Sequence, residues 1–219
     1  MNDVVLRTLQ NTDWITLILC CSILAIVVAK SFFYQRFYNF IILPFNNKYI
    51  FMYNKKDKLS HWFTIFLFIF QLLNLALFIY LVARIFSISD QNNSEYIYFI
   101  ILGSLFLFFS AKILLHLGNA FVFNTSGIIS EFLFKKISYQ NYRGFIMFIA
   151  NILLTYVLKD SKTIIYVSSF LILLINAIGW VTVIRNHQKL ITNNFFYFIL
   201  YLCALEITPL VLIGDYFKD

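Results

Sequence analysis

The stretch that decides the fold is residues 96–123, YIYFIILGSLFLFFSAKILLHLGNAFVF. It is long and apolar enough to cross a bilayer as a helix. It also contains Lys112, His116 and Asn119, whose i, i+4, i+7 spacing places them on one face of that helix. Placing a charged side chain in a lipid-spanning helix raises the free energy of the protein unless that side chain faces protein or water. We therefore expect this helix to pack in a bundle with its polar stripe turned inward.

Composition places the whole chain in a membrane. Of its 219 residues, 61% are hydrophobic and 12% are charged, whereas soluble domains have about 25% charged residues. The formal net charge is +7, which in a soluble protein would suggest a nucleic-acid partner. Here the positive residues lie beside apolar stretches, where they orient a protein in the membrane. We expect the lipid bilayer, and no nucleic acid, as a partner.

Apolar runs divide the chain into six predicted membrane spans. Together with one interfacial amphipathic helix, they predict an all-α, six-helix membrane bundle that forms a single domain over residues 1–219. The spans are expected at about 14–29, 62–83, 96–119, 142–158, 164–184 and 195–213, and the interfacial helix at about 31–43. Only five residues, 159–163, separate the fourth span from the fifth. This short turn predicts an antiparallel hairpin.

The longest predicted loop, residues 30–61, combines basic and aromatic residues. In its first half, apolar residues recur every three or four positions, which is typical of a helix in the headgroup plane, and Pro44 ends it. The second half carries four lysines among aromatic side chains, and we expect it to touch anionic lipid. Docking of a protein partner is the alternative. The lysines are Lys48, Lys55, Lys56 and Lys58.

The distribution of charge predicts the orientation of the spans. Lysine and arginine concentrate in residues 30–61, 124–143 and 185–194, which lie on one side of the membrane if there are six spans. Most acidic residues fall on the other side. By the positive-inside rule, both termini are expected outside the cytoplasm.

Lys112 and Glu206 are the ionisable residues placed deepest in the predicted spans. At about 1.5 Å per residue, their depths differ by less than about 10 Å, and an ion pair or a shared water is our leading hypothesis. The alternative is that Lys112 reaches the inner interface while Glu206 is protonated or hydrogen-bonded. Pro209 follows Glu206 by three residues and is expected to kink the helix. Such breaks near a carboxylate occur at ion sites in transporters. A kink that merely aids packing is the more common case.

The three histidines, His61, His116 and His187, all map to the cytoplasmic half of the predicted bundle. They could converge on a metal or a haem. None has a second ligand at the spacing of H-x-x-x-H or HExxH, so we expect neither a metal site nor a cofactor, and interfacial histidines are the simpler interpretation. Cys20, Cys21 and Cys203 lie in apolar spans without a CxxC pattern, and we expect them to be small buried side chains.

Five polar residues lie in the middle of predicted spans. We expect them to form hydrogen bonds across helices and to indicate a packed bundle in place of a pore. They are Gln71, Asn74, Asn151, Thr155 and Asn176.

The sixth span contains the run FYFILYLCALEITPL, residues 196–210. This run, together with residues 14–30 and the Phe37 that follows, resembles an uncharacterised family of Bacteroidota inner-membrane proteins, domain of unknown function 4271. The resemblance covers essentially the whole chain. It implies a multi-span protein of a bacterial inner membrane, and it offers no catalytic residues. Glu206 and Pro209 belong to the segment that carries it.

Three classes of function follow. The first is a non-enzymatic membrane subunit or assembly factor that packs against other membrane proteins, because the sequence shows neither a catalytic motif nor a soluble domain. The second is a small proton- or ion-coupled transporter that uses Glu206 and Lys112. The third is a haem- or metal-handling membrane protein that uses His61, His116 and His187.

Overall fold

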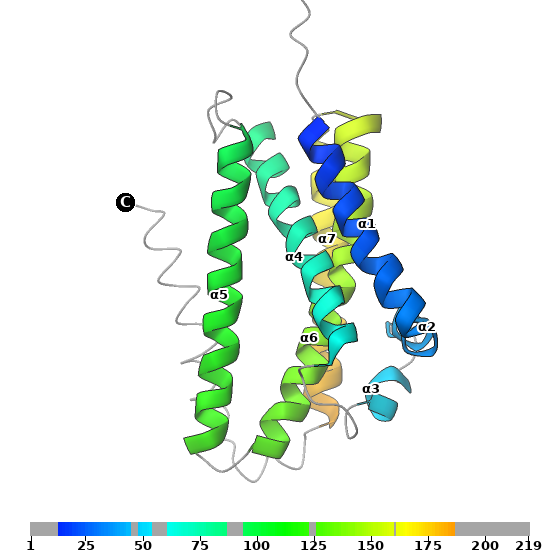
Figure 1. Ribbon diagram of the computed structural model, residues 1–219, viewed down its shortest axis with the longest axis vertical. Helices are drawn as coiled ribbons and strands as arrows, with labels where there is room; N and C mark the ends of the chain where they lie inside the picture. Colours follow the sequence, from blue (N-terminus) through cyan, green and yellow to red (C-terminus); the bar gives the residue numbers. More distant parts are fainter. Residues whose placement is uncertain are drawn as a thin grey trace, which may run out of the picture.

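A computed structural model describes residues 13–44, 48–53, 61–86, 94–122, 126–159 and 161–186. All regular secondary structure in these ranges is helical (Figure 1). The elements are α1 (Asp13–Phe32), α2 (Tyr34–Ile41), α3 (Lys48–Tyr53), α4 (Trp62–Ile85), α5 (Ser94–Val122), α6 (Ser126–Ile152), the π-helical turn η2 (Leu153–Val157) and α7 (Lys162–Asn186).

Four of these helices are long and apolar enough to cross a membrane. They are α1, α4, the Glu95–His116 part of α5 and the Lys162–Thr182 part of α7. The predicted all-helical fold is thereby confirmed for the described residues, and its multi-pass membrane character is supported. The predicted sixth span, residues 195–213, lies outside the described residues.

The segment predicted as a loop over 124–143 is helical from Ser126 onward, and that prediction was wrong. It continues without a break into the predicted fourth span as the single helix α6. Its buried residues Phe134, Ser138 and Asn141 recur every three or four positions, which is the spacing of one helical face. This part of the helix was not predicted because polar side chains on that face interrupt the apolar run, and the prediction relied on continuous apolar runs.

Helix α4 forms the centre of the structure, with α1, α5 and α6 around it (Figure 1). Of the apolar stretch of α4, 56% is buried, compared with 6% of that of α5. At Gly144 of α6, an added Cβ would lie 3.0 Å from Cα of Gln71. The absence of a side chain there lets α4 and α6 approach closely, which is the role of small residues in membrane helix packing.

Helices α6 and α7 form an antiparallel pair. At one end, Leu154 and Ile165 share a hydrophobic cluster, and at the other the hydroxyl of Tyr139 donates a hydrogen bond to Oγ1 of Thr182 at 3.3 Å. Between the two helices, η2 closes with a bond from the backbone N–H of Leu158 to the carbonyl of Leu153 at 2.8 Å. A hairpin from the fourth predicted span to the fifth therefore exists.

The predicted helix at 31–43 is shorter than expected and packs against protein. Helix α1 runs on to Phe32, and α2 starts only at Tyr34. Phe40 of α2 is fully buried and its ring lies 5.9 Å from that of Phe63 on α4. The guanidinium of Arg36 lies 4.6 Å from the ring centroid of Tyr53 on α3. The apolar face of α2 therefore belongs to an aromatic cluster inside the protein.

The cysteines on α1 differ from the expectation as well. Cys20 and Cys21 are both exposed, so the prediction of buried side chains was wrong for this pair. The buried face of α1 is made by Ile15, Leu19 and Ser22, one to two turns apart. Cys203 lies outside the described residues.

Candidate functional site

The polar stripe of α5 faces α6. Lys112 lies against Lys136 of α6, and His116 is buried with 1% exposure close to both lysines. The amine of Lys112 also lies 5.9 Å from the ring centroid of Phe108. Lys112 and His116, two of the three residues of the predicted stripe, therefore turn toward protein. Asn119 lies on α5, and its side chain is outside the described part of the chain.

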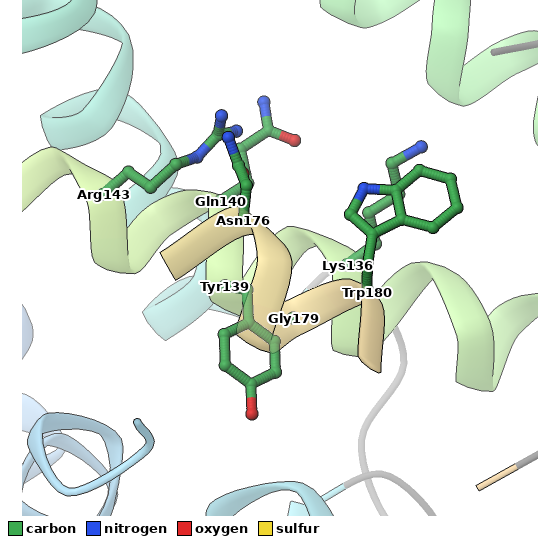
Figure 2. A pocket seen from close by; sticks show the side chains of 7 residues that line it. All are labelled: Lys136, Tyr139, Gln140, Arg143, Asn176, Gly179 and Trp180. Atoms are coloured by element: carbon green, nitrogen blue, oxygen red, sulfur yellow. The ribbon is translucent and has the colours of Figure 1, made fainter. Parts of the chain in front are cut away.

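A polar face of α6 continues this centre toward α7. Lys136, Gln140 and Arg143 follow one another at i, i+4 and i+7, so they share one side of the helix. On α7, Asn176 and Trp180 are four residues apart and face them. These five side chains, with Tyr139 and Gly179, line a cavity of about 60 Å³ (Figure 2).

Tyr139 and Gly179 fix the distance between the two helices at the cavity. A Cβ at Gly179 would meet the Cγ of Tyr139 at 3.0 Å, so the ring lies directly against the backbone of α7. Thr182, which accepts the hydrogen bond from Tyr139, donates its own hydroxyl to the carbonyl of Ile178 at 2.9 Å. The position of the cavity is therefore set by packing and by a hydrogen-bonded chain.

The cavity is rich in hydrogen-bond donors and positive charge. Nε of Arg143 is buried without a hydrogen-bond partner. Lys136, which precedes the fourth predicted span, has a pKa lowered to about 7, mainly by burial and then by the neighbouring charges of Lys112 and Arg143. None of the seven lining residues is acidic. Such a set of groups can bind an anion.

This cavity was not predicted from the sequence. Lys136 had been assigned to a loop and Arg143 to the edge of a span. The spacing of Lys136, Gln140 and Arg143 was the signal that could have revealed a polar helical face.

Two of the predicted mid-span polar residues, Asn74 of α4 and Asn151 of α6, form a hydrogen bond with each other. Nδ2 of Asn151 donates to the carbonyl of Asn74 at 3.0 Å and to its Oδ1 at 3.4 Å, which confirms a hydrogen bond across the helices. Asn74 in turn donates to the carbonyl of Phe70 at 2.8 Å. The side-chain amide of Gln71 and the hydroxyl of Thr155 are buried without hydrogen-bond partners, so for these two residues the prediction was wrong.

The structure gives one of the three histidines a structural role. Nδ1 of His61 accepts a hydrogen bond from the backbone N–H of Phe63 at 3.2 Å and so caps the start of α4. The described residues contain no group of three or more His, Cys, Asp or Glu side chains arranged to hold a metal ion. His187 lies outside the described residues.

Several further residues singled out from the sequence also lie outside the described part of the chain. Lys48 begins α3, and nothing is described of its side chain. The others are Lys55, Lys56, Lys58, Glu206 and Pro209.

A model of a protein family, Domain of unknown function (DUF4271), matches residues 15–217. The chain belongs to this family. The DUF4271 match extends over the predicted sixth span, including the run at 196–210 that carried the resemblance. No curated protein and no solved structure matches the chain.

Proposed function

We propose that this DUF4271 protein is a non-enzymatic subunit or assembly factor of a bacterial inner membrane, such as that of Bacteroidota, and that it packs against other membrane proteins. In this proposal six helices span the bilayer, with residues 142–158 and 195–213 added to the four apolar helices. Both termini lie outside the cytoplasm, and α2 lies at the level of the headgroups with its outer face toward lipid.

The outer face of α5 is the observation that carries the proposal. Large and small side chains alternate along it at steps of three or four residues, and all six are exposed. They are Ile100, Ser104, Leu107, Ala111, Leu114 and Gly118. We name this set the α5 seam.

The α5 seam has the pattern of a helix–helix contact. Its small residues recur every seven positions, as do its large ones, which is the repeat by which two helices interlock side chains. A helix that faces only lipid gains nothing from small residues, whereas small residues let two membrane helices approach closely. An added Cβ at Gly118 would meet nothing within 4 Å, so a partner helix has room there.

Site-specific photo-crosslinking tests this proposal. A photoreactive amino acid at Leu107, in the α5 seam, should crosslink the chain in its native membrane to a second membrane protein of reproducible mass. Leu173 on α7 is a matched control, because it is also an apolar residue that is two-thirds exposed. Crosslinks from Leu107 only to lipid, or only to residues 187–219 of the same chain, would overturn the proposal.

A second function, an ion-coupled carrier, is favoured by one contact. Lys112 lies against Lys136 and close to Arg143, which concentrates charge in the cytoplasmic half of the proposed bundle. In this second function, Glu206 is the proton- or ion-carrying group. Reconstituted protein should then show an ion or proton flux that Glu206→Gln abolishes while folding is retained. Equal fluxes in the variant and the natural protein would exclude this function.

A further inference from the structure

We propose that the cavity between α6 and α7 binds a phosphate group, supplied by the headgroup of an anionic phospholipid or by a soluble phosphate compound. This inference concerns a ligand site and does not depend on the protein partner proposed above.

The donors around the cavity match a phosphate group. Figure 2 shows the guanidinium of Arg143 beside the side-chain amides of Gln140 and Asn176, while Lys136 lies next to the indole of Trp180. Guanidinium, ammonium, amide and indole groups all carry N–H donors, and phosphate oxygens only accept. Arginine is the side chain best suited to phosphate, because its planar fork can form two parallel hydrogen bonds.

Two properties of Arg143 indicate that the ligand is an anion: its buried Nε and the lack of a carboxylate nearby in the lining. Its Nε is buried and donates to no described group, and a buried donor without an acceptor is unfavourable. The lining supplies no carboxylate to neutralise its charge. An anion in the cavity would provide the missing counter-charge, and a reorientation of the guanidinium toward that anion would give Nε an acceptor.

The size of the cavity is suitable for a phosphate group. One water needs at least about 10–15 Å³ of such space, so about 60 Å³ holds several water molecules. A single tetrahedral oxyanion replaces such a water cluster with several acceptors at fixed geometry.

The surroundings of the cavity favour a phospholipid as the source. Trp180 and Tyr139 are amphipathic side chains of the kind that lie at headgroup level. Leu173 and Ala177 precede Trp180 on the same face of α7, and both are exposed. An acyl chain can therefore run along this face from a headgroup held in the cavity. Lys136 and Arg143 also belong to the segments predicted to face the anionic cytoplasmic leaflet.

Lipid binding to the purified full-length protein tests the inference. Native mass spectrometry in detergent would measure adducts with phosphatidylglycerol, and titration calorimetry would measure binding of inorganic phosphate. We expect Arg143→Gln and Lys136→Gln each to weaken phosphate-group binding at least tenfold. Lys162→Gln is the matched control, because it makes the same charge change at the opposite end of α7 and should leave binding unchanged.

The two measurements distinguish a phospholipid headgroup from a soluble phosphate compound as the source of the phosphate group. Phosphatidylglycerol binding that inorganic phosphate does not displace, and that Arg143→Gln removes, would support a lipid site. Inorganic phosphate that binds alone, and is lost in the same variant, would support a soluble phosphate compound. Folding of each variant is checked by thermal unfolding, and Asn176→Ala replaces Arg143→Gln if the latter does not fold. Unchanged binding of both probes by the folded variants, or no binding by the natural protein, would overturn the inference.

Discussion

The ring of Tyr139 lies against the backbone of Gly179, so closely that an added Cβ would be 3.0 Å from Cγ of the ring. This contact joins α6 to α7 at the donor-rich cavity. It depends on the absence of a side chain at residue 179, because the neighbouring atoms belong to the stiff base of the ring and not to a flexible end.

Gly179→Ala should therefore destabilise the protein. Overpacking of a tight contact costs about 1–3 kcal/mol, which exceeds the gain in helix propensity of about 1 kcal/mol. The midpoint of thermal unfolding in detergent should fall. Gly103→Ala on α5 is the control, because its Cβ would meet nothing within 4 Å, and it should be neutral or slightly stabilising. A Gly179→Ala protein as stable as the Gly103→Ala protein would contradict the close contact.

Asn74 and Asn151 should be energetically coupled. Asn151→Ala removes the donor that reaches both oxygens of Asn74, and we expect a loss of about 1 kcal/mol. In a double-mutant cycle with Asn74→Ala, the two losses should not add, with a coupling energy of about 0.6 kcal/mol or more. Asn74→Ala removes only the side-chain acceptor at 3.4 Å and keeps the backbone carbonyl at 3.0 Å, so additive losses would show that the side-chain bond contributes nothing to stability.

Binding of a phosphate group should weaken as the pH rises. The pKa of Lys136 is lowered to about 7, so its amine is charged at pH 6 and largely neutral at pH 8. Lys112 and His116 of α5 and Arg143 of α6 are the charged and titratable groups that face it. Affinity for phosphatidylglycerol measured between pH 6 and pH 8 should fall in the natural protein. In Lys136→Gln this pH dependence should be much smaller, and an equal dependence in both proteins would assign it to another group.

Lys112 and Glu206 can be tested as a pair although Glu206 lies outside the described residues. If they interact, Lys112→Met and Glu206→Gln should each reduce stability, and the double variant should lose less than the two single losses combined. The midpoint of thermal unfolding measures this. The exchanged variant, with Lys112→Glu and Glu206→Lys, should recover part of the loss. Strict additivity without recovery would favour the alternative in which Lys112 reaches the inner interface.

The sequence alone determined four of the helical membrane elements, α1, α4, α5 and α7. An apolar run of about 20 residues has one stable form in lipid, because every backbone polar group must be bonded within the segment. The predicted spans at 14–29, 62–83, 96–119 and 164–184 accordingly lie within α1, α4, α5 and α7. The inward direction of Lys112 followed from the same physics, and so did the expectation that Asn74 and Asn151 each bond across helices, because buried polar groups are hydrogen-bonded. The structure alone showed that these two asparagines bond to each other.

Only the tertiary structure decided how helical faces meet. Helix α6 buries Ser138 and Asn141 and turns Lys136, Gln140 and Arg143 toward α7, so hydropathy could not show where this helix began. The cavity requires the polar faces of α6 and α7 to meet at one depth, and that depth is fixed by Tyr139 on Gly179. Spacing within one helix gives a face, whereas rotation and depth relative to a second helix are set by packing between residues about 40 positions apart.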